Sequence, residues 1–444
     1  MKLQKIRLKY TIMLLLLAAI LPAQSLRLKS LDSLVVAADR PGAYLASLYD
    51  KNVGMVVNHS STLKDGKHLV DFLLANKIKV KKIFSPEHGF RGTASAGAKV
   101  ESGKDAKTGL PVISLYGNHK KPTAADLEGL DILIFDIQDV GARFYTYIST
   151  LSYVMEAAAE NKVKVMVFDR PNPHGYYIDG PILELKHKSF VGMHPVPIVH
   201  GMTVGEYARM VNGEGWLQGA VQCDLEVIPC RNYDHNTAYE LPIKPSPNLP
   251  NRLAVTLYPS LCLFEGTPVS IGRGTDFPFQ LIGAPWFKEF GFNFTPEDRP
   301  GAANPPYEGV ECKGFVLQDF ADSYMDGLGE IYLYWLVESY RMAPDKTKFF
   351  KPFFTLLAGT TKLQEQIEQG LSAEEIRAFY TLSPPLELCP AARGLGSRVP
   401  LGEMDCVNYA RLERAMWAVT QNTFVNSGPV LSPNPFQTWQ LGEI

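Results

Sequence analysis

The chain has 444 residues, of which 46% are hydrophobic and 11% aromatic, so it is long enough for two domains with sizeable cores. Its 44 basic and 46 acidic residues give a net charge of −2. This balance argues against nucleic acid as a partner, because binding a phosphate backbone needs a basic surface.

The first 24 residues have the parts of an export signal. Four basic residues precede an apolar core at 11–21, and small residues follow near residue 24. The core is too short to span a bilayer, so we predict a signal peptide at 1–24 that is removed on export to the periplasm or the exterior. The alternative is an uncleaved anchor. No later segment is long enough to cross a membrane, and we expect no stable membrane insertion after removal of the signal.

The first half of the mature chain alternates strand-like and helix-like runs. Strand-like apolar runs cover 53–57, 78–84, 111–116, 131–138 and 163–168, and helical spacing covers 68–76 and 147–161. This alternation predicts an α/β fold with a mostly parallel sheet and helices on both faces.

Polar residues cluster where four of these strands end. His59 follows the first strand, Glu87-His88 the second, residues 138–145 the third and residues 169–173 the fourth. Ligands of open α/β sheets bind beyond the carboxyl ends of the strands, so we expect these groups to lie along one edge of the sheet.

A proline-rich stretch divides the chain. Residues 241–250 hold four prolines and can form neither a helix nor a central strand. We place a domain junction there, with one domain at 25–250 and a second at 251–382. In the second half, helices are predicted at 329–342 and 362–369.

Several kinds of site lack their motifs. The turn after the first strand has none of the glycines of a dinucleotide fingerprint, and we find neither a P-loop nor a G-x-S-x-G pentapeptide. A metal site lacks ligand spacing of the H-E-x-x-H or C-x-x-C kind, although five residues could in principle converge: His59, His88, Asp136, Asp139 and His174. We predict no cofactor and no metal. The six cysteines are expected to be free thiols.

Catalysis by carboxyl groups is the class of chemistry that remains after these motifs are found to be lacking. Glu87, Asp139, Asp169 and Glu265 each lie in loop-like settings beside Gly, Pro or aromatic residues. Glycoside cleavage needs one protonated and one ionised carboxyl group. Glu87, between two phenylalanines, suits the acid, but spacing does not identify its partner. A role in turns or ion pairs is the alternative for the other three.

Arginines occur in the same motifs. Arg91, Arg143 and Arg273 could each grip a substrate carboxylate through two parallel hydrogen bonds, or pair with a neighbouring acid. Tyr145 and Trp286 could stack on a sugar face or belong to the core.

Seven segments together resemble one known family. In chain order they are SPEHGFRG, DIQDVGARFYTY, DRPNPHG, PIVHGMTVGEYARM, PSPNLP, LFEGTPVSIGRGTDFPF and GAPW. They are similar to the motifs of the NamZ-type exo-β-N-acetylmuramidases, and the similarity runs from about residue 53 to about residue 379. The resemblance implies a Rossmann-like N-terminal domain, a smaller α+β C-terminal domain and an active-site cleft between them.

The resemblance also implies an activity and a set of site residues. The activity is release of terminal β-linked N-acetylmuramic acid from the non-reducing ends of peptidoglycan fragments. An exo-lyase on the same bond and a non-catalytic muropeptide-binding protein are the alternatives. The catalytic candidates are Glu87, with Glu265 or Asp139 as the second carboxylate, unless the acetamido group of the substrate serves instead. The expected substrate contacts are His88, Arg91, Arg143, Tyr145, Asn172, Asn248 and Arg273. Residues 383–444 depart from the family pattern, and we treat them as a divergent tail.

Overall fold

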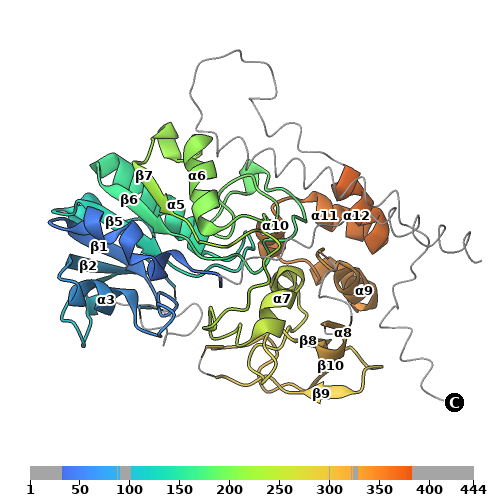
Figure 1. Cartoon of the computed structure of the whole chain (residues 1–444). Helices are drawn as coiled ribbons and strands as arrows, with labels where there is room; N and C mark the ends of the chain where they lie inside the picture. Colours follow the sequence, from blue (N-terminus) through green and yellow to red (C-terminus); the bar gives the residue numbers. More distant parts are fainter. Residues whose placement is uncertain are drawn as a thin grey trace, which may run out of the picture.

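The structure is a computed structural model that describes residues 33–87, 89–90, 102–299, 301–321, 323 and 329–382 (Figure 1). The predicted signal peptide, the tail at 383–444, His88 and Arg91 lie outside the described residues. None of the described helices combines the length and the apolar character that crossing a bilayer requires.

A seven-stranded sheet forms the first lobe. Its strands are β1 (Asn52–Val57), β2 (Lys79–Ser85), β3 (Gly103–Lys104), β4 (Pro111–Ser114), β5 (Ile132–Asp136), β6 (Lys164–Phe168) and β7 (Leu225–Ile228). Their spatial order is β3-β4-β2-β1-β5-β6-β7, and all neighbours are parallel except β3 and β4. Without the short edge strand β3, this is the doubly wound order of dinucleotide-binding folds, so the predicted Rossmann-like domain is confirmed.

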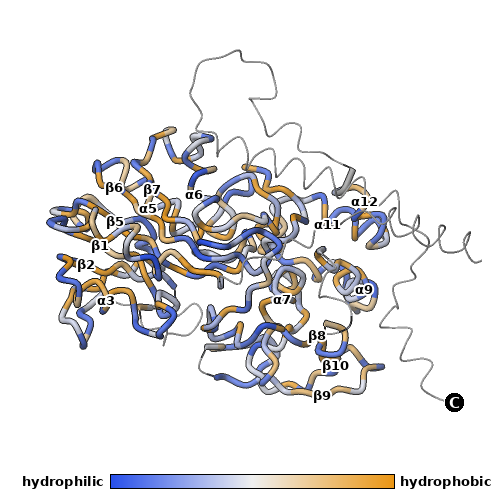
Figure 2. The backbone as a smooth tube through the Cα atoms, in the orientation of Figure 1, coloured by the Kyte–Doolittle hydropathy of each residue, from blue (hydrophilic) through white to orange (hydrophobic). Residues whose placement is uncertain are grey.

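Successive residues of the central strands bury opposite faces of this sheet. Met55, Ile134 and Met166 pack with α3 (Leu69–Ala75) and with an N-terminal segment that includes α2 (Leu45–Leu48). Their neighbours Phe135 and Val165 pack against the other face. That face is covered by α4 (Ala124–Leu127), α5 (Tyr147–Asn161) and α6 (Val204–Gly213). Because both faces are covered, the strands are apolar along nearly their whole length, as Figure 2 shows.

The second lobe is smaller and mixed, as predicted. Its antiparallel sheet has the order β8-β10-β9, formed by β8 (Leu281–Ala284), β9 (Phe292–Phe294) and β10 (Cys312–Val316). Six helices accompany this sheet among the described residues: α7 (Arg252–Leu261), α8 (Gln318–Phe320), α9 (Tyr334–Met342), α10 (Pro352–Ala358), α11 (Lys362–Glu368) and α12 (Ala373–Leu382). In Figure 1, α7 and α10 lie between the two sheets.

Two helix boundaries show the limits of sequence patterns. The helix predicted from residue 329 begins only at Tyr334, because the Ile331 amide donates to Asp179 Oδ2 (2.5 Å) and the Tyr332 amide donates to Ser260 Oγ (2.9 Å). Helix α7 was not predicted, since it contains Pro259 near its C-terminal end. It begins at Asn251, whose side chain accepts a hydrogen bond from the Ala254 amide (3.0 Å).

Candidate active site

The carboxyl ends of β1, β2, β5 and β6 lie along one edge of the sheet, because these strands are parallel neighbours. His59, Glu87, Asp139 and Asp169 follow these ends, each within three residues. The structure therefore brings together the described members of the four polar clusters, as the alternating pattern predicted.

Glu87 is held by hydroxyl groups from two other elements. The Tyr116 hydroxyl donates to Glu87 Oε1 (3.0 Å), and the Thr146 hydroxyl lies 3.3 Å from Oε2. Tyr116 follows β4, and Thr146 is the residue immediately before α5. Glu87 is only partly buried, and these two contacts restrain its carboxyl group. A carboxyl group in this setting can exchange a proton with a bound molecule.

The proline-rich segment at 241–250, called here the junction segment, lies against this edge of the sheet. Tyr145 donates to the carbonyl of Pro245 (2.9 Å), and Tyr147 contacts the same carbonyl (3.5 Å). On the β1 side, His59 Nε2 lies 2.8 Å from the carbonyl of Lys244. Burial lowers the pKa of His59, which favours the neutral imidazole. His59 beyond β1, together with Tyr145 and Tyr147 around the start of α5, thus holds the junction segment over the site.

Asp139 is the most enclosed of the candidate carboxyl groups, with 4% of its surface exposed. Its Oδ1 accepts a hydrogen bond from the Gly141 amide (2.7 Å), whereas its Oδ2 has no hydrogen-bond partner among the described residues. Burial raises the pKa of Asp139 to about 7. Burial is the largest cause that raises the pKa of Tyr145 and of Tyr147, and the charges of Asp139 and Glu87 raise it further. Each of these tyrosines therefore interacts electrostatically with both acids.

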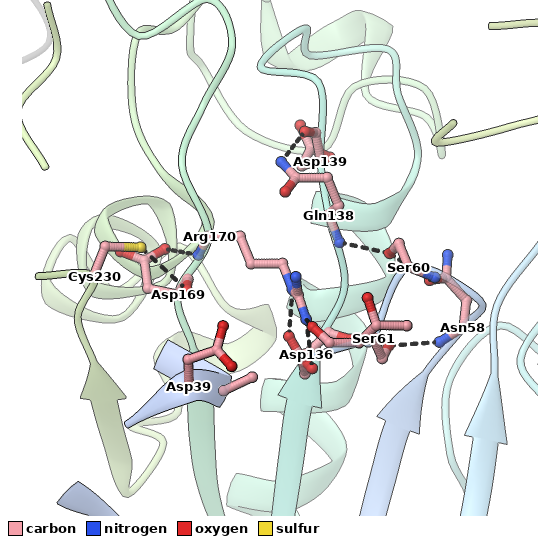
Figure 3. A network of polar contacts seen from close by, with 12 residues as sticks. Asp39, Asn58, Ser60, Ser61, Asp136, Gln138, Asp139, Asp169, Arg170 and Cys230 are labelled. Carbon is pink, nitrogen blue, oxygen red and sulfur yellow. Dashed lines mark hydrogen bonds and ion pairs between the residues drawn. The ribbon is translucent and has the colours of Figure 1, made fainter. Parts of the chain in front are cut away.

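Serine side chains cross the switch point between β1 and β5, where a dinucleotide would bind in other folds of this order. Ser61 Oγ donates to the carbonyl of Asp136, and the backbone N–H of Gln138 donates to Ser60 Oγ (3.0 Å). Figure 3 shows this network at the ends of the strands. The loops after β1 and β5 therefore bond to each other.

Asp136 and Asp169 have internal partners in the same network (Figure 3). Asp136 is fully buried and forms a two-pronged ion pair with Arg170, at 2.5 Å to Nε and 2.9 Å to Nη2. Asp169 accepts hydrogen bonds from the Thr203 hydroxyl and the Gly205 amide, both 2.8 Å, at the beginning of α6. Both carboxylates hold strand ends and helix starts in place.

Arg143 lies in the core between the lobes, with 1% of its surface exposed. Its Nη1 donates to the carbonyls of Pro181 and Val196, both 2.7 Å, and its Nη2 donates to those of Leu357 (2.9 Å) and Ala358 (2.8 Å). The side chain that was expected to grip a substrate carboxylate is bonded here to four backbone oxygens.

Three further candidates are buried and bonded within the protein. Asn172 Nδ2 donates to the carbonyl of Met202 (2.8 Å), and Asn248 Nδ2 donates to that of Gly301 (2.6 Å). Tyr145 is also buried, with its hydroxyl group on the junction segment. These side chains hold loops of the protein to one another, and a direct contact of any of them with a substrate stays a prediction.

Glu265 and Arg273 form an ion pair in the second lobe. Arg273 Nε and Nη2 lie 2.6 and 2.5 Å from Glu265 Oε1, and the two side chains are 25% and 23% exposed. Arg273 lies over the ring of Phe279, which packs against Tyr258 of α7, and Tyr258 in turn packs against Tyr145 (centroids 5.7 Å). A continuous series of aromatic contacts thus joins this pair to the tyrosines near Glu87.

Sequence reasoning missed Tyr116 and Thr146. The strand predicted at 111–116 ends at Ser114, so Tyr116 belongs to the strand ends and not to the sheet. The signal was the rule already applied to Glu87, that residues just beyond a parallel strand face the site. Thr146 lies inside a motif from which only Asp139, Arg143 and Tyr145 were chosen as site candidates.

Sequence comparisons agree with these features. Two family models match, "Exo-beta-N-acetylmuramidase NamZ, N-terminal" over residues 53–253 and "Exo-beta-N-acetylmuramidase NamZ, C-terminal" over residues 256–382. A protein of Bacillus subtilis described as "Peptidoglycan beta-N-acetylmuramidase NamZ" is 41% identical over 359 residues, which cover 76% of this chain and 84% of that protein.

Two crystal structures of DUF1343 family proteins from Bacteroides fragilis are also similar. One is 49% identical, covers 79% of this chain and 94% of its own, and has a TM-score of 0.73. The other is 26% identical, covers 86% of this chain and 97% of its own, and has a TM-score of 0.67.

Proposed function

This chain belongs to the NamZ exo-β-N-acetylmuramidase family, and on that premise we propose that it is an exo-acting glycoside hydrolase. Its proposed reaction is hydrolysis of the terminal β-linked N-acetylmuramic acid at the non-reducing ends of peptidoglycan fragments. The observation that carries the proposal is the position of Glu87, which lies at the carboxyl edge of the sheet, is held by two hydroxyl groups and is only partly buried.

Glu87 is the proposed general acid. When the glycosidic bond breaks, its proton passes to the departing oxygen, and the carboxylate that remains is stabilised by Tyr116 and Thr146. The second acidic role has two candidates with different environments. Asp139 is enclosed and its pKa is raised to about 7, whereas Glu265 is partly exposed and lies against the guanidinium group of Arg273. Participation of the acetamido group of the substrate is the third route.

Arg273 suits the acid group of the substrate. N-acetylmuramic acid carries a lactyl carboxylate, and a guanidinium group binds such a group through parallel hydrogen bonds. Arg273 is partly exposed in the second lobe, whereas Arg143 is enclosed by backbone carbonyls. We therefore favour Arg273 for this contact among the described arginines of the three motifs.

The test is incubation of the purified protein with a MurNAc–GlcNAc disaccharide, followed by mass spectrometry of the products. Hydrolysis gives two intact sugars, elimination gives one product lighter by a water molecule, and a binding protein gives neither. We expect Glu87→Gln to lower the rate by roughly 100-fold to 10,000-fold, since it removes the transferable proton and keeps an acceptor for Tyr116. Glu128→Gln is the matched control, because Glu128 is exposed and lies before β5, at the opposite edge of the sheet. A folded Glu87→Gln variant with the wild-type rate would refute the assignment.

Export is part of the proposal. The basic and apolar segments within residues 1–24 suit a removed signal peptide, and removal would deliver the enzyme to cell-wall material. The test is N-terminal mapping by mass spectrometry of the protein recovered outside the cytoplasm. Recovery only of full-length protein from the cytoplasm would contradict it.

A further inference from the structure

We propose that Tyr116, together with Thr146, is a positioning residue that controls the protonation of Glu87. The proposal rests on the proposed function, because it concerns the acid of that reaction. Tyr116 and Thr146 act through Glu87 and need not touch the substrate.

The register of the sheet places Tyr116 beside Glu87. Strands β2 and β4 are parallel, and Ser85 is paired with Ser114 at their ends. The pairing continues one step further, where the Leu115 amide donates to the carbonyl of Ser85 (2.8 Å). Glu87 and Tyr116 are each two residues beyond the registered pair, so the two side chains leave the sheet at the same level. Strand pairing thus brings together the two turns from which these side chains form their hydrogen bond.

Thr146 has a hydroxyl group that its own helix does not use. It occupies the N-cap position of the 15-residue helix α5, where a Thr side chain commonly accepts a hydrogen bond from the first turn. No such bond forms here, and the hydroxyl group lies 3.3 Å from Glu87 Oε2 instead. The beginning of α5 is thus close to Glu87, and the positive end of a helix favours a negative charge there.

The two hydrogen bonds of Glu87 differ in length, and we assign different roles to its two carboxyl oxygens. Oε1 is bound at 3.0 Å by a phenol that stays neutral, because burial and then the charge of Glu87 raise the pKa of Tyr116. Oε2 has the longer contact, and we assign the transferable proton to it. As the proton leaves for the glycosidic oxygen, charge develops on the carboxylate, and both hydrogen bonds become charge-assisted and stronger.

The other titratable groups near Glu87 lie, like Thr146, around the start of α5. Among the described residues they are Tyr145 and Tyr147 at the start of α5, and both also interact with Asp139. Burial raises the pKa of both tyrosines, so they are uncharged at neutral pH. Among the described groups that act on Glu87, Tyr116 and Thr146 are therefore ones whose hydrogen bonds can be removed singly without loss of a bond to the junction segment.

The test is the pH dependence of kcat/KM for Tyr116→Phe on the same disaccharide. Without the phenol, the ionised form of Glu87 is less stable, so a general acid keeps its proton to higher pH. We expect the alkaline limb to move up by about one pH unit and the maximal rate to fall roughly tenfold. A 3-fluorotyrosine at position 116 is a stronger donor of the same shape, and it should move the limb to lower pH. Tyr49→Phe is the control, since Tyr49 is exposed and precedes β1 at the opposite edge of the sheet.

A second pair of variants tests Thr146 without changing the packing of Tyr116. Thr146→Val removes the hydroxyl group and should move the alkaline limb upward, whereas Thr146→Ser keeps the hydroxyl group and the wild-type profile. Identical profiles for wild type, Tyr116→Phe and Thr146→Val overturn the proposal, whatever happens to the maximal rate. The proposed function fails separately, and only if Glu87→Gln retains the wild-type rate.

Discussion

Arg143 offers a sharp test of how the two lobes are held together. Its guanidinium group is a buried cation whose partners in the described structure are four backbone carbonyls, two in the segment at 181–196 and two at the end of α10. Arg143→Met keeps most of the aliphatic stem and removes every donor, so four buried carbonyl oxygens lose this donor at once, although that of Val196 keeps its hydrogen bond from the Leu183 amide (3.2 Å).

The magnitude follows from these contacts. An unsatisfied buried acceptor costs about 1–3 kcal/mol, but water or small shifts will satisfy some of the four, and the variant no longer buries a charge. We therefore expect a loss of about 4 kcal/mol in the free energy of unfolding, in the range measured when one side of a buried charged interaction is removed. Arg143→Lys should recover only part of this loss, since an ammonium group cannot reach four separated carbonyls.

The assay is equilibrium urea unfolding, followed by far-UV circular dichroism and by tryptophan fluorescence. Trp335 is fully buried in α9 of the second lobe, but Trp216 follows α6 in the first lobe. The assay therefore uses a background with Trp216→Phe, Trp417→Phe and Trp439→Phe, in which fluorescence reports on the second lobe. Because the bonds of Arg143 span both lobes, the variant should also unfold in two steps, with the fluorescence change first. The control is Arg341→Met, which breaks a half-exposed ion pair with Glu338 and should cost less than about 1 kcal/mol. Equal losses for the two variants would refute this account of Arg143.

Two further predictions concern Asp139 and the turn after it. The pKa of Asp139 is about 7 in the folded protein and about 3.9 in the unfolded chain. Between these two pH values the folded state binds more protons than the unfolded state. The free energy of unfolding therefore contains a contribution from this proton that is lost as the pH rises from about 4 through 7. Asp139→Asn should remove that part of the pH dependence in urea unfolding at pH 5 and pH 8, and an unchanged slope would contradict the prediction. Gly141 has φ of +74°, and an added Cβ would lie 2.0 Å from Asn172 Oδ1, whereas Gly109 has φ of +72° and open space around it. Gly141→Ala should therefore lower Tm clearly more than Gly109→Ala, because the second variant has only the backbone strain of about 1 kcal/mol. Equal decreases in Tm would show that the contact with Asn172 is unimportant.

The sequence was most informative where local patterns and burial coincide. The apolar runs at 53–57, 131–138 and 163–168 are strands of the sheet, because strands covered on both faces must be apolar at nearly every position. The rule that polar residues follow parallel strands then brought His59, Glu87 and Asp139 to one edge. The seven motifs identified the family before any geometry was known.

Other features depended on contacts between residues far apart in the chain. Helix α7 forms although it contains Pro259. Helix α9 begins later than predicted because the distant side chains of Asp179 and Ser260 accept hydrogen bonds from the amides before it. Sequence separation also concealed the contact between Glu87 and Tyr116, since Tyr116 comes 29 positions after Glu87 and the pairing of β2 with β4 brings them together.

By itself, the sequence determined the mostly parallel sheet, the smaller second lobe and the placement of polar residues at the strand ends, because periodicity, proline content and residue type act locally. The tertiary structure alone decided which charged groups are available. Arg143 and Asp136 look as reactive in the sequence as Glu87, yet one is surrounded by carbonyls and the other is bound to Arg170. A charge that is buried must find its partners inside the protein, and those partners are chosen by packing in three dimensions.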